Sequence, residues 1–263
     1  MNLKIGIIQG RLTEAPPGRL QWSPNDYKPE FKTAKALGFE YLELFSERIY
    51  NPENPLWNKK KIKELKESCL IKNKLIFYSF VDDYILKNKI DDKLESYYQN
   101  LILILNQLKI KILTVPFYGI NKINKKNYKN YLKFIIFISK KCSKSNIKLC
   151  IESNMSPDLF FIIKKSVKKN FYITFDTGNR ILLKRDLVQD LIAFNKSIKH
   201  IHIKDKDHTK KNVQLGRGLV NFKSLFLNLK KIDYSGGITF ETTRGKNSII
   251  SAKNNLLFIK KLL

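Results

Sequence analysis

Four polar side chains in the second half of the sequence each follow a short apolar run, and all four are of types that bind divalent cations. The runs are CIESN (150–154), TFDTGN (174–179), HIHIKD (200–205) and TFETT (239–243), and the side chains are Glu152, Asp176, His202 and Glu241. Their spacings of 24, 26 and 39 residues lie near the roughly 30 residues that one strand and one helix occupy in a (β/α)8 barrel of about 250 residues. One candidate ligand per unit predicts an active site where successive strands end.

The alternation of side chains along a strand decides which way these residues face. In a barrel, successive side chains of a strand point alternately to the axis and to the surrounding helices. The neighbours on the opposite face are apolar: Ile151, Phe175, Ile201, Ile203 and Phe240. The four polar side chains can therefore all point to the axis, where three unpaired carboxylates would repel one another and be costly to bury. A divalent cation removes that cost.

The ligand types indicate the class of metal. Three carboxylates and one imidazole form a hard, mixed site that suits Mn²⁺, Mg²⁺ or Co²⁺, while Zn²⁺ stays open. Taken singly, Glu152 could cap a helix, Asp176 could begin an Asx-turn in DTGN, and His202 could be a hydrogen-bonded core histidine. Glu241 has the weakest such alternative. Four strand ends in succession favour the metal site over four separate structural roles.

Eight apolar runs separated by helical segments must position these residues. The predicted strands are 4–10, 39–45, 74–80, 111–117 and the four runs above, and the predicted helices include 28–37, 58–71, one with apolar positions from Leu94 to Leu105, 125–144, and 247 to the end. Strands alternating with helices imply a parallel arrangement with right-handed crossovers. No GxGxxG or Walker loop follows a strand, which disfavours an open nucleotide-binding sheet. We expect one α/β domain over 1–263, a single TIM barrel.

Composition narrows the cellular setting. The chain is 43% hydrophobic but has no apolar run of the ~18 residues that a membrane span needs, and no signal peptide is evident, so a cytoplasmic enzyme is expected. The net charge is +27, with only seven arginines among 50 basic residues and lysines scattered over every segment. Phosphate contacts of nucleic acids require clustered charge. Solvated lysine faces are favoured over a nucleic-acid surface, with attraction to anionic sugars or sugar phosphates as an intermediate interpretation.

Five further residues are candidates for substrate contact. Glu43, near the end of a strand, could bind a substrate hydroxyl or pair with a lysine or arginine; His200 shares the inward face of His202. Lys204 and Asp205 follow His202 closely enough to contact substrate or to support the metal ligands. Arg217 lies between two glycines in QLGRGLVNF (214–222), where it could hold a hydroxyl or a phosphate, or be an ordinary loop arginine.

These residues resemble the xylose-isomerase-like TIM-barrel superfamily, which includes sugar isomerases, ketose 3-epimerases, inosose dehydratase and endonuclease IV. Glu152, Asp176, His202 and Glu241 are similar in type, order and strand position to the metal ligands of ketose 3-epimerases, and Arg217 to their substrate-contacting arginine. The segments GIIQGRL, GRLQ and NPLW resemble a sugar phosphate isomerase/epimerase branch. Asn179 departs from the histidine of many relatives, and three histidines are too few for the metal cluster of endonuclease IV.

The resemblance implies an isomerase that moves protons through a metal-stabilised enediolate of a small-molecule sugar or sugar phosphate. Glu152 and Glu241 would be its base and acid: two bases invert a carbon, whereas one base carrying a proton between carbons isomerises. A dehydratase of the lyase class, a nucleic-acid enzyme and a barrel that only binds sugar are the alternatives, and a homo-oligomer stays open.

Overall fold

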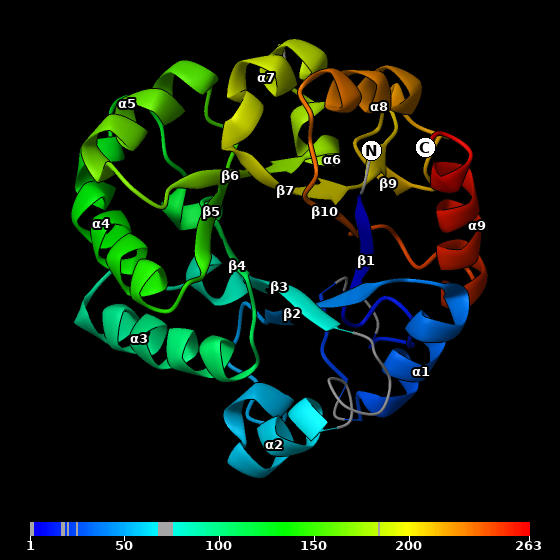
Figure 1. The fold of residues 1–263 in the computed structure, drawn as a ribbon, viewed down its shortest axis with the longest axis horizontal. Coiled ribbons are helices and arrows are strands. Elements are labelled where there is room, and N and C mark those ends of the chain that lie inside the picture. The colour runs from blue at the N-terminus through cyan, green and yellow to red at the C-terminus, as the bar shows by residue number, and fades with distance from the viewer. Residues whose placement is uncertain (1–2, 17–18, 20, 25, 68–75, 184) are drawn as a thin grey trace.

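A computed structural model describes residues 3–16, 19, 21–24, 26–67, 76–183 and 185–263. Eight parallel strands close into a barrel (Figure 1) in the order β1-β10-β7-β6-β5-β4-β3-β2. They are β1 Lys4–Ile8, β2 Tyr41–Ser46, β3 Ile76–Asp82, β4 Ile112–Pro116, β5 Lys148–Glu152, β6 Tyr172–Asp176, β7 Ile198–Ile203 and β10 Gly237–Phe240. Because β1 pairs with both β2 and β10, the sheet has no open edge.

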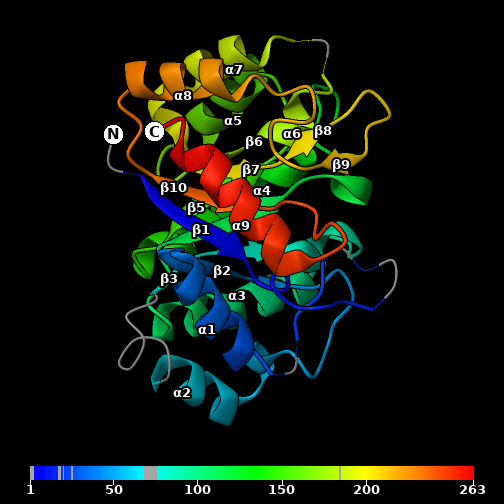
Figure 2. The ribbon, with the colours of Figure 1, turned by 90° about the vertical axis from the view of Figure 1, so that its right-hand side faces the viewer.

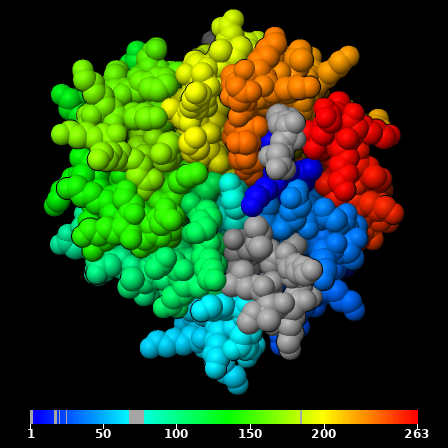
Figure 3. Space-filling view, viewed as in Figure 1, coloured from blue at the N-terminus to red at the C-terminus, as the bar shows by residue number. Residues whose placement is uncertain are grey.

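Helices surround the barrel, as Figures 1 and 2 show. In the space-filling view the described helices lie side by side around it (Figure 3). They are α1 Lys28–Leu37, α2 Lys59–Glu67, α3 Asp92–Gln107, α4 Tyr128–Lys144, α5 Pro157–Val167, α6 Thr177–Arg180, α7 Leu187–Phe194, α8 Phe222–Lys231 and α9 Ser248–Lys260. Sequence signals set several ends: Ser156 caps α5 at Leu159, and Gly38, with φ of 90°, ends α1. Among the described residues, no helix combines the length and apolar character needed to cross a bilayer.

The two faces of the strands differ in polarity. The outward residues Ile151, Phe175, Ile201 and Phe240 are fully buried beneath the helices. The barrel interior instead carries hydrogen-bonded polar pairs, such as Thr114 with Thr174 at 2.7 Å and Tyr41 with Thr239 at 2.8 Å. The hydrophobic layer therefore lies between the sheet and the helices, and polar side chains occupy positions along the barrel axis.

The predicted TIM barrel is confirmed, with differences at the boundaries. Strand β3 extends to Asp82, beyond the expected end. Residues 68–75, where the predicted strand 74–80 begins and the predicted helix 58–71 ends, lie outside the described residues. Helix α4 begins at Tyr128 because the side chains of Asn124 and Asn127 accept backbone hydrogen bonds in the preceding turn. A two-stranded hairpin, β8 Asp205–Lys206 with β9 Asn212–Val213, is too short for periodicity to indicate.

Candidate active site

The structure brings the four predicted ligands together at the carboxyl ends of their strands. One ligand atom from each of Glu152, Asp176, His202 and Glu241 lies within 4.8 Å of the other three, and all four residues are buried. Nδ1 of His202 lies 3.1 Å from Oε2 of Glu152 and 3.3 Å from Oε2 of Glu241. The group draws one residue each from β5, β6 and β7 and one from the position after β10.

Strand register explains this convergence. His202 on β7 pairs with Asp176 on β6 and with Thr239 on β10, two residues before Glu241. The backbone N–H of Glu241 donates to the carbonyl of Ile203 at 3.1 Å, which holds it at the same level of the barrel. Asp176 also caps α6, because its Oδ1 accepts the N–H of Asn179 at 2.6 Å. Asp176 therefore caps a helix instead of forming the Asx-turn considered from the sequence, and it keeps its place in the cluster.

A lysine ammonium already lies among these carboxylates. Nζ of Lys204 is 2.7 Å from Oδ2 of Asp176 and 2.8 Å from Oε2 of Glu241. The stem of Lys204 lies so close to Gly178 that a Cβ there would come within 2.4 Å of it. Glycine in DTGN thus makes room for this lysine.

The pKa shifts show how far the charges are balanced. Burial opposes ionisation of Glu241, but Lys204 and His202 outweigh it and hold the pKa of that carboxyl well below its usual range. Burial raises the pKa of Asp176 to about 7, against the attraction of Lys204 and with added repulsion from Glu152 and Glu241. The cluster is thus still short of positive charge, and its donor set of three carboxylates and an imidazole fits a divalent cation.

Glu43 and His200 lie beneath the cluster and are fully buried. Oε2 of Glu43 is 2.9 Å from Nε2 of His200, and Oε1 is 3.2 Å from Nε2 of His202. Burial opposes ionisation of Glu43, but the two histidines outweigh it and hold its pKa far below the usual range. Neither residue lines the cavity described below, and both contact His202. Their substrate contact stays a prediction. Glu43 orients that imidazole so that Nδ1 faces the carboxylates.

We expect Glu43→Gln to weaken divalent-metal binding about 10- to 100-fold, because metal-ligating histidines depend on such carboxylate partners. Competition with a chromogenic chelator measures the dissociation constant directly. Thr114→Val, which removes a buried hydrogen bond to Thr174 elsewhere in the barrel interior, is the matched control. Equal losses in the two variants would show that Glu43 acts only through general stability.

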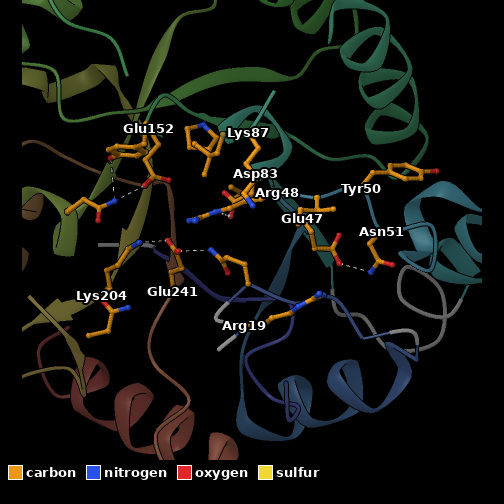
Figure 4. A pocket seen from close by; sticks show the side chains of 18 of the residues that line it. Arg19, Glu47, Arg48, Tyr50, Asn51, Asp83, Lys87, Glu152, Lys204 and Glu241 are labelled. Atoms are coloured by element: carbon orange, nitrogen blue, oxygen red, sulfur yellow. Dashed lines mark hydrogen bonds and ion pairs between the residues drawn. The ribbon is translucent and has the colours of Figure 1, made fainter. Parts of the chain in front are cut away.

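A cavity of about 730 Å³ opens beside the cluster (Figure 4). Glu152, Lys204 and Glu241 line it at one end, together with Asn179, whose amide donates to Oε1 of Glu152 at 3.2 Å. Arg48, Asp83 and Lys87 line the other part, towards the loop after β2. The size is in the range of small-molecule sites.

Two further predicted substrate residues, Asp205 and Arg217, also lie outside this lining. Asp205 is buried, and its carboxylate accepts the backbone N–H groups of Lys206, Gly216, Gly218 and Val220 at 2.9 to 3.0 Å. It therefore shapes the loop before α8. Arg217 lies on that loop with an exposed side chain, and it is not among the residues that line the described cavity. Their substrate roles stay predictions.

A long-range contact at Glu241 was not expected from the sequence. Nε2 of Gln21 donates to Oε1 of Glu241 at 2.8 Å, and Nη2 of Arg11 donates to Gln21 at 2.8 Å. Nε of Arg244 donates to the carbonyl of Gly10 at 2.7 Å and so holds the loop after β1. Gly10, at φ of 78°, is required because a Cβ would strike the carbonyl of Trp22. The only sequence signal for Gln21 was the resemblance of the GRLQ segment to a family branch, and this resemblance gave Gln21 no role.

Asp83 provides a pH-dependent test of the cavity's electrostatics. Burial, helped by Glu241 and opposed by Arg48, raises its pKa from an ordinary 3.8 to about 7. The folded protein therefore holds this proton more tightly than the unfolded chain does, so this group's contribution to stability falls as pH rises from about 4 to about 7 and then levels off. Asp83→Asn should gain stability relative to wild type across that window.

Urea unfolding of the chelator-treated protein at several pH values between 4.5 and 8.5 measures this difference. Asp158→Asn, at an exposed position on α5, controls for the loss of one charge. A difference between Asp83→Asn and wild type that stays the same at every pH would contradict the raised pKa.

The fold and the cluster define a class: (β/α)8 barrels with a mixed carboxylate and imidazole centre at the strand ends. The chain belongs to the xylose isomerase-like TIM barrel family, whose model matches residues 31–262. No curated protein matches the sequence.

Solved structures share the fold over the whole chain. The xylose isomerase domain protein from Planctomyces limnophilus is 13% identical, with a TM-score of 0.79 over 100% of this chain and 98% of that one. The D-psicose 3-epimerase from Clostridium cellulolyticum H10, solved with D-tagatose, is 18% identical, with a TM-score of 0.77 over 99% of each chain. The IOLI protein, solved with a bound zinc atom, is 16% identical, with a TM-score of 0.78 over 99% of each chain.

Proposed function

We propose that the protein is a divalent-metal-dependent isomerase or epimerase of a sugar or sugar phosphate. The observation that carries this proposal is the approach of Glu152 and Glu241 to one imidazole nitrogen of His202, at 3.1 and 3.3 Å, while both line the same cavity. Epimerases among proteins of the same fold support the choice of reaction.

The metal would be held by Glu152, Asp176, His202 and Glu241 and would supply Lewis-acid polarisation of a substrate carbonyl. The chain's own residues divide the remaining work. Glu241, kept ionised by Lys204 and His202, can remove a proton from the carbon beside the carbonyl. Glu152, steadied by Asn179, can return a proton to the same carbon or to its neighbour.

Lys204 places a fixed positive charge beside the reacting centre. Its ammonium contacts Asp176 and Glu241 and lines the cavity, so it can stabilise negative charge that develops on substrate oxygen. Gln21 lines the cavity next to Glu241, and its hydrogen bond orients that carboxylate.

The test has two parts. Metal content of the purified protein, before and after reconstitution with Mn²⁺, should approach one equivalent and fall on His202→Ala. Deuterium uptake from D₂O into a panel of ketoses and ketose phosphates should then occur at one carbon of one substrate, without loss of mass. Loss of one water would instead establish a dehydratase, and absence of metal after reconstitution would refute the proposal.

A further inference from the structure

The arginines of this chain occupy one side of the molecule. All seven follow strands, on the face that carries the cavity: Arg11 and Arg19 after β1, Arg48 after β2, Arg180 and Arg185 after β6, Arg217 after β9 and Arg244 after β10. The surrounding helices α1–α5 and α7–α9 contain no arginine, and all of them except α7 contain lysine. Because arginine differs from lysine mainly in its planar, forked donors, this distribution indicates sites where hydrogen-bond geometry matters.

Most of these arginines have partners within the protein. Arg180 and Arg185 donate to Asp190, Arg244 donates to the carbonyl of Gly10, and Arg11 donates to Gln21. Each of these contacts fixes a loop around the cavity. They explain why an arginine is present at four of the seven positions.

Arg48 is different, because it lines the cavity and its guanidinium donates no hydrogen bond to any residue that the structure describes. Its Nε lies 3.9 Å from Oδ2 of Asp83, beyond hydrogen-bond distance. Arg19 and Lys87 line the same cavity (Figure 4), and between their side chains and the described residues no hydrogen bond is formed either. Three cationic groups thus offer their donors to the cavity.

The acidic groups nearby do not cancel these donors. The carboxylate of Glu47 is engaged by the side-chain amides of Asn51 and Asn54, each at 2.8 Å. Asp83 has a pKa of about 7, so it is only partly ionised at neutral pH. The part of the cavity around Arg48 therefore has a surplus of positive charge with open donors.

The cavity is also larger than one neutral sugar requires. Its 730 Å³ lies in the upper part of the roughly 300 to 1,000 Å³ range of small-molecule sites, and a hexose has only twelve non-hydrogen atoms. Arg48 lies between the end marked by Glu152 and Glu241 and the loop that bears Tyr50 and Asn51 (Figure 4). A substituent of a substrate held at the carboxylate cluster can reach it.

We infer that Arg48, together with Arg19 and Lys87, binds an anionic substituent of the substrate, a phosphate ester or a carboxylate. That the rest of the substrate is a sugar rests on the proposed function, but the anion site itself does not. Guanidinium and oxyanion form charge-assisted, often paired hydrogen bonds, which are the strong ones among protein polar contacts.

The first experiment titrates inorganic phosphate into the protein at low ionic strength by calorimetry. Arg48→Gln should weaken phosphate binding about tenfold, the effect of one charge-assisted hydrogen bond. The variant should fold normally, since the Arg48 side chain is 56% exposed. Lys211→Gln, an exposed charge of the same loop face outside the cavity lining, is the matched control and should change binding less than about twofold.

An unchanged affinity in Arg48→Gln, or an equal loss in Lys211→Gln, would overturn the inference and leave only general attraction to a basic protein. Arg217→Gln adds a decisive comparison: loss in that variant but not in Arg48→Gln would move the anion site to the loop before α8.

The second experiment compares a set of ketoses, their phosphates and the corresponding sugar acids by binding and by deuterium exchange. Tighter binding of phosphates or of sugar acids, abolished in Arg48→Gln, identifies which anion the site takes. Such binding without exchange at any carbon would refute the proposed function and leave the anion site standing. Equal binding and equal exchange in neutral and phosphorylated ketoses would support the proposed function and refute the anion site.

Discussion

Glu241→Gln should lower kcat by about 10²- to 10⁴-fold, the usual contribution of a positioned general base. The substitution keeps the size of the side chain and its place between Gln21 and Lys204, 2.8 Å from each. It removes a cavity-lining carboxylate whose pKa Lys204 and His202 hold well below the usual range. Turnover and deuterium exchange at saturating Mn²⁺ measure the effect.

Because Glu241 is also a proposed ligand, metal occupancy must be determined in the same samples. Glu53→Gln, on an exposed loop, controls for the change of charge. Full turnover by Glu241→Gln at unchanged metal occupancy would exclude Glu241 from proton transfer.

Asp190→Asn should lower the free energy of unfolding by about 3 to 5 kcal/mol, because it leaves a buried guanidinium without its counter-charge. Nη1 of Arg180 lies 2.8 Å from Oδ2 of Asp190, and the two residues are 2% and 5% exposed. The same guanidinium donates to the carbonyl of Ser153 at 2.8 Å, so the loss should also loosen the turn that follows Glu152.

Urea unfolding monitored by circular dichroism tests this prediction. Asp186→Asn is the matched control, since Asp186 caps the same helix α7 from an exposed position and asparagine caps about equally well. If both variants lost the same small amount, the buried ion pair would not be a major source of stability.

Local patterns in the sequence were sufficient to predict the barrel and to group four of its polar residues. Alternation along each strand assigned Glu152, Asp176 and His202 to the axis, and parallel register then required their strand ends to meet. The two histidines HIH could be placed on one face, but which nitrogen of His202 faces the carboxylates depends on Glu43, which lies 159 residues away in the chain.

Contacts made by loops could not be predicted in this way. Gln21 reaches Glu241 across 220 residues only because Gly10 and Arg244 fold the loop after β1 back over the barrel. Arg217 was selected for its glycine neighbours, whereas Arg48, without any motif around it, lines the cavity. Periodicity describes regular elements, and loop conformation depends on tertiary hydrogen bonds that it does not record.

The pairing of β1 with β10 has a consequence for biosynthesis. Strand β1 lies within the first ten residues, and its partner β10 is synthesised more than 200 residues later. One edge of β1 is therefore unpaired while the ribosome is still translating the chain. Open edges recruit other strands, and such distant pairings form slowly. Glu241 follows β10 directly, so the proposed ligand set is complete only once this last strand has been made, and until then the nascent chain carries an unpaired edge.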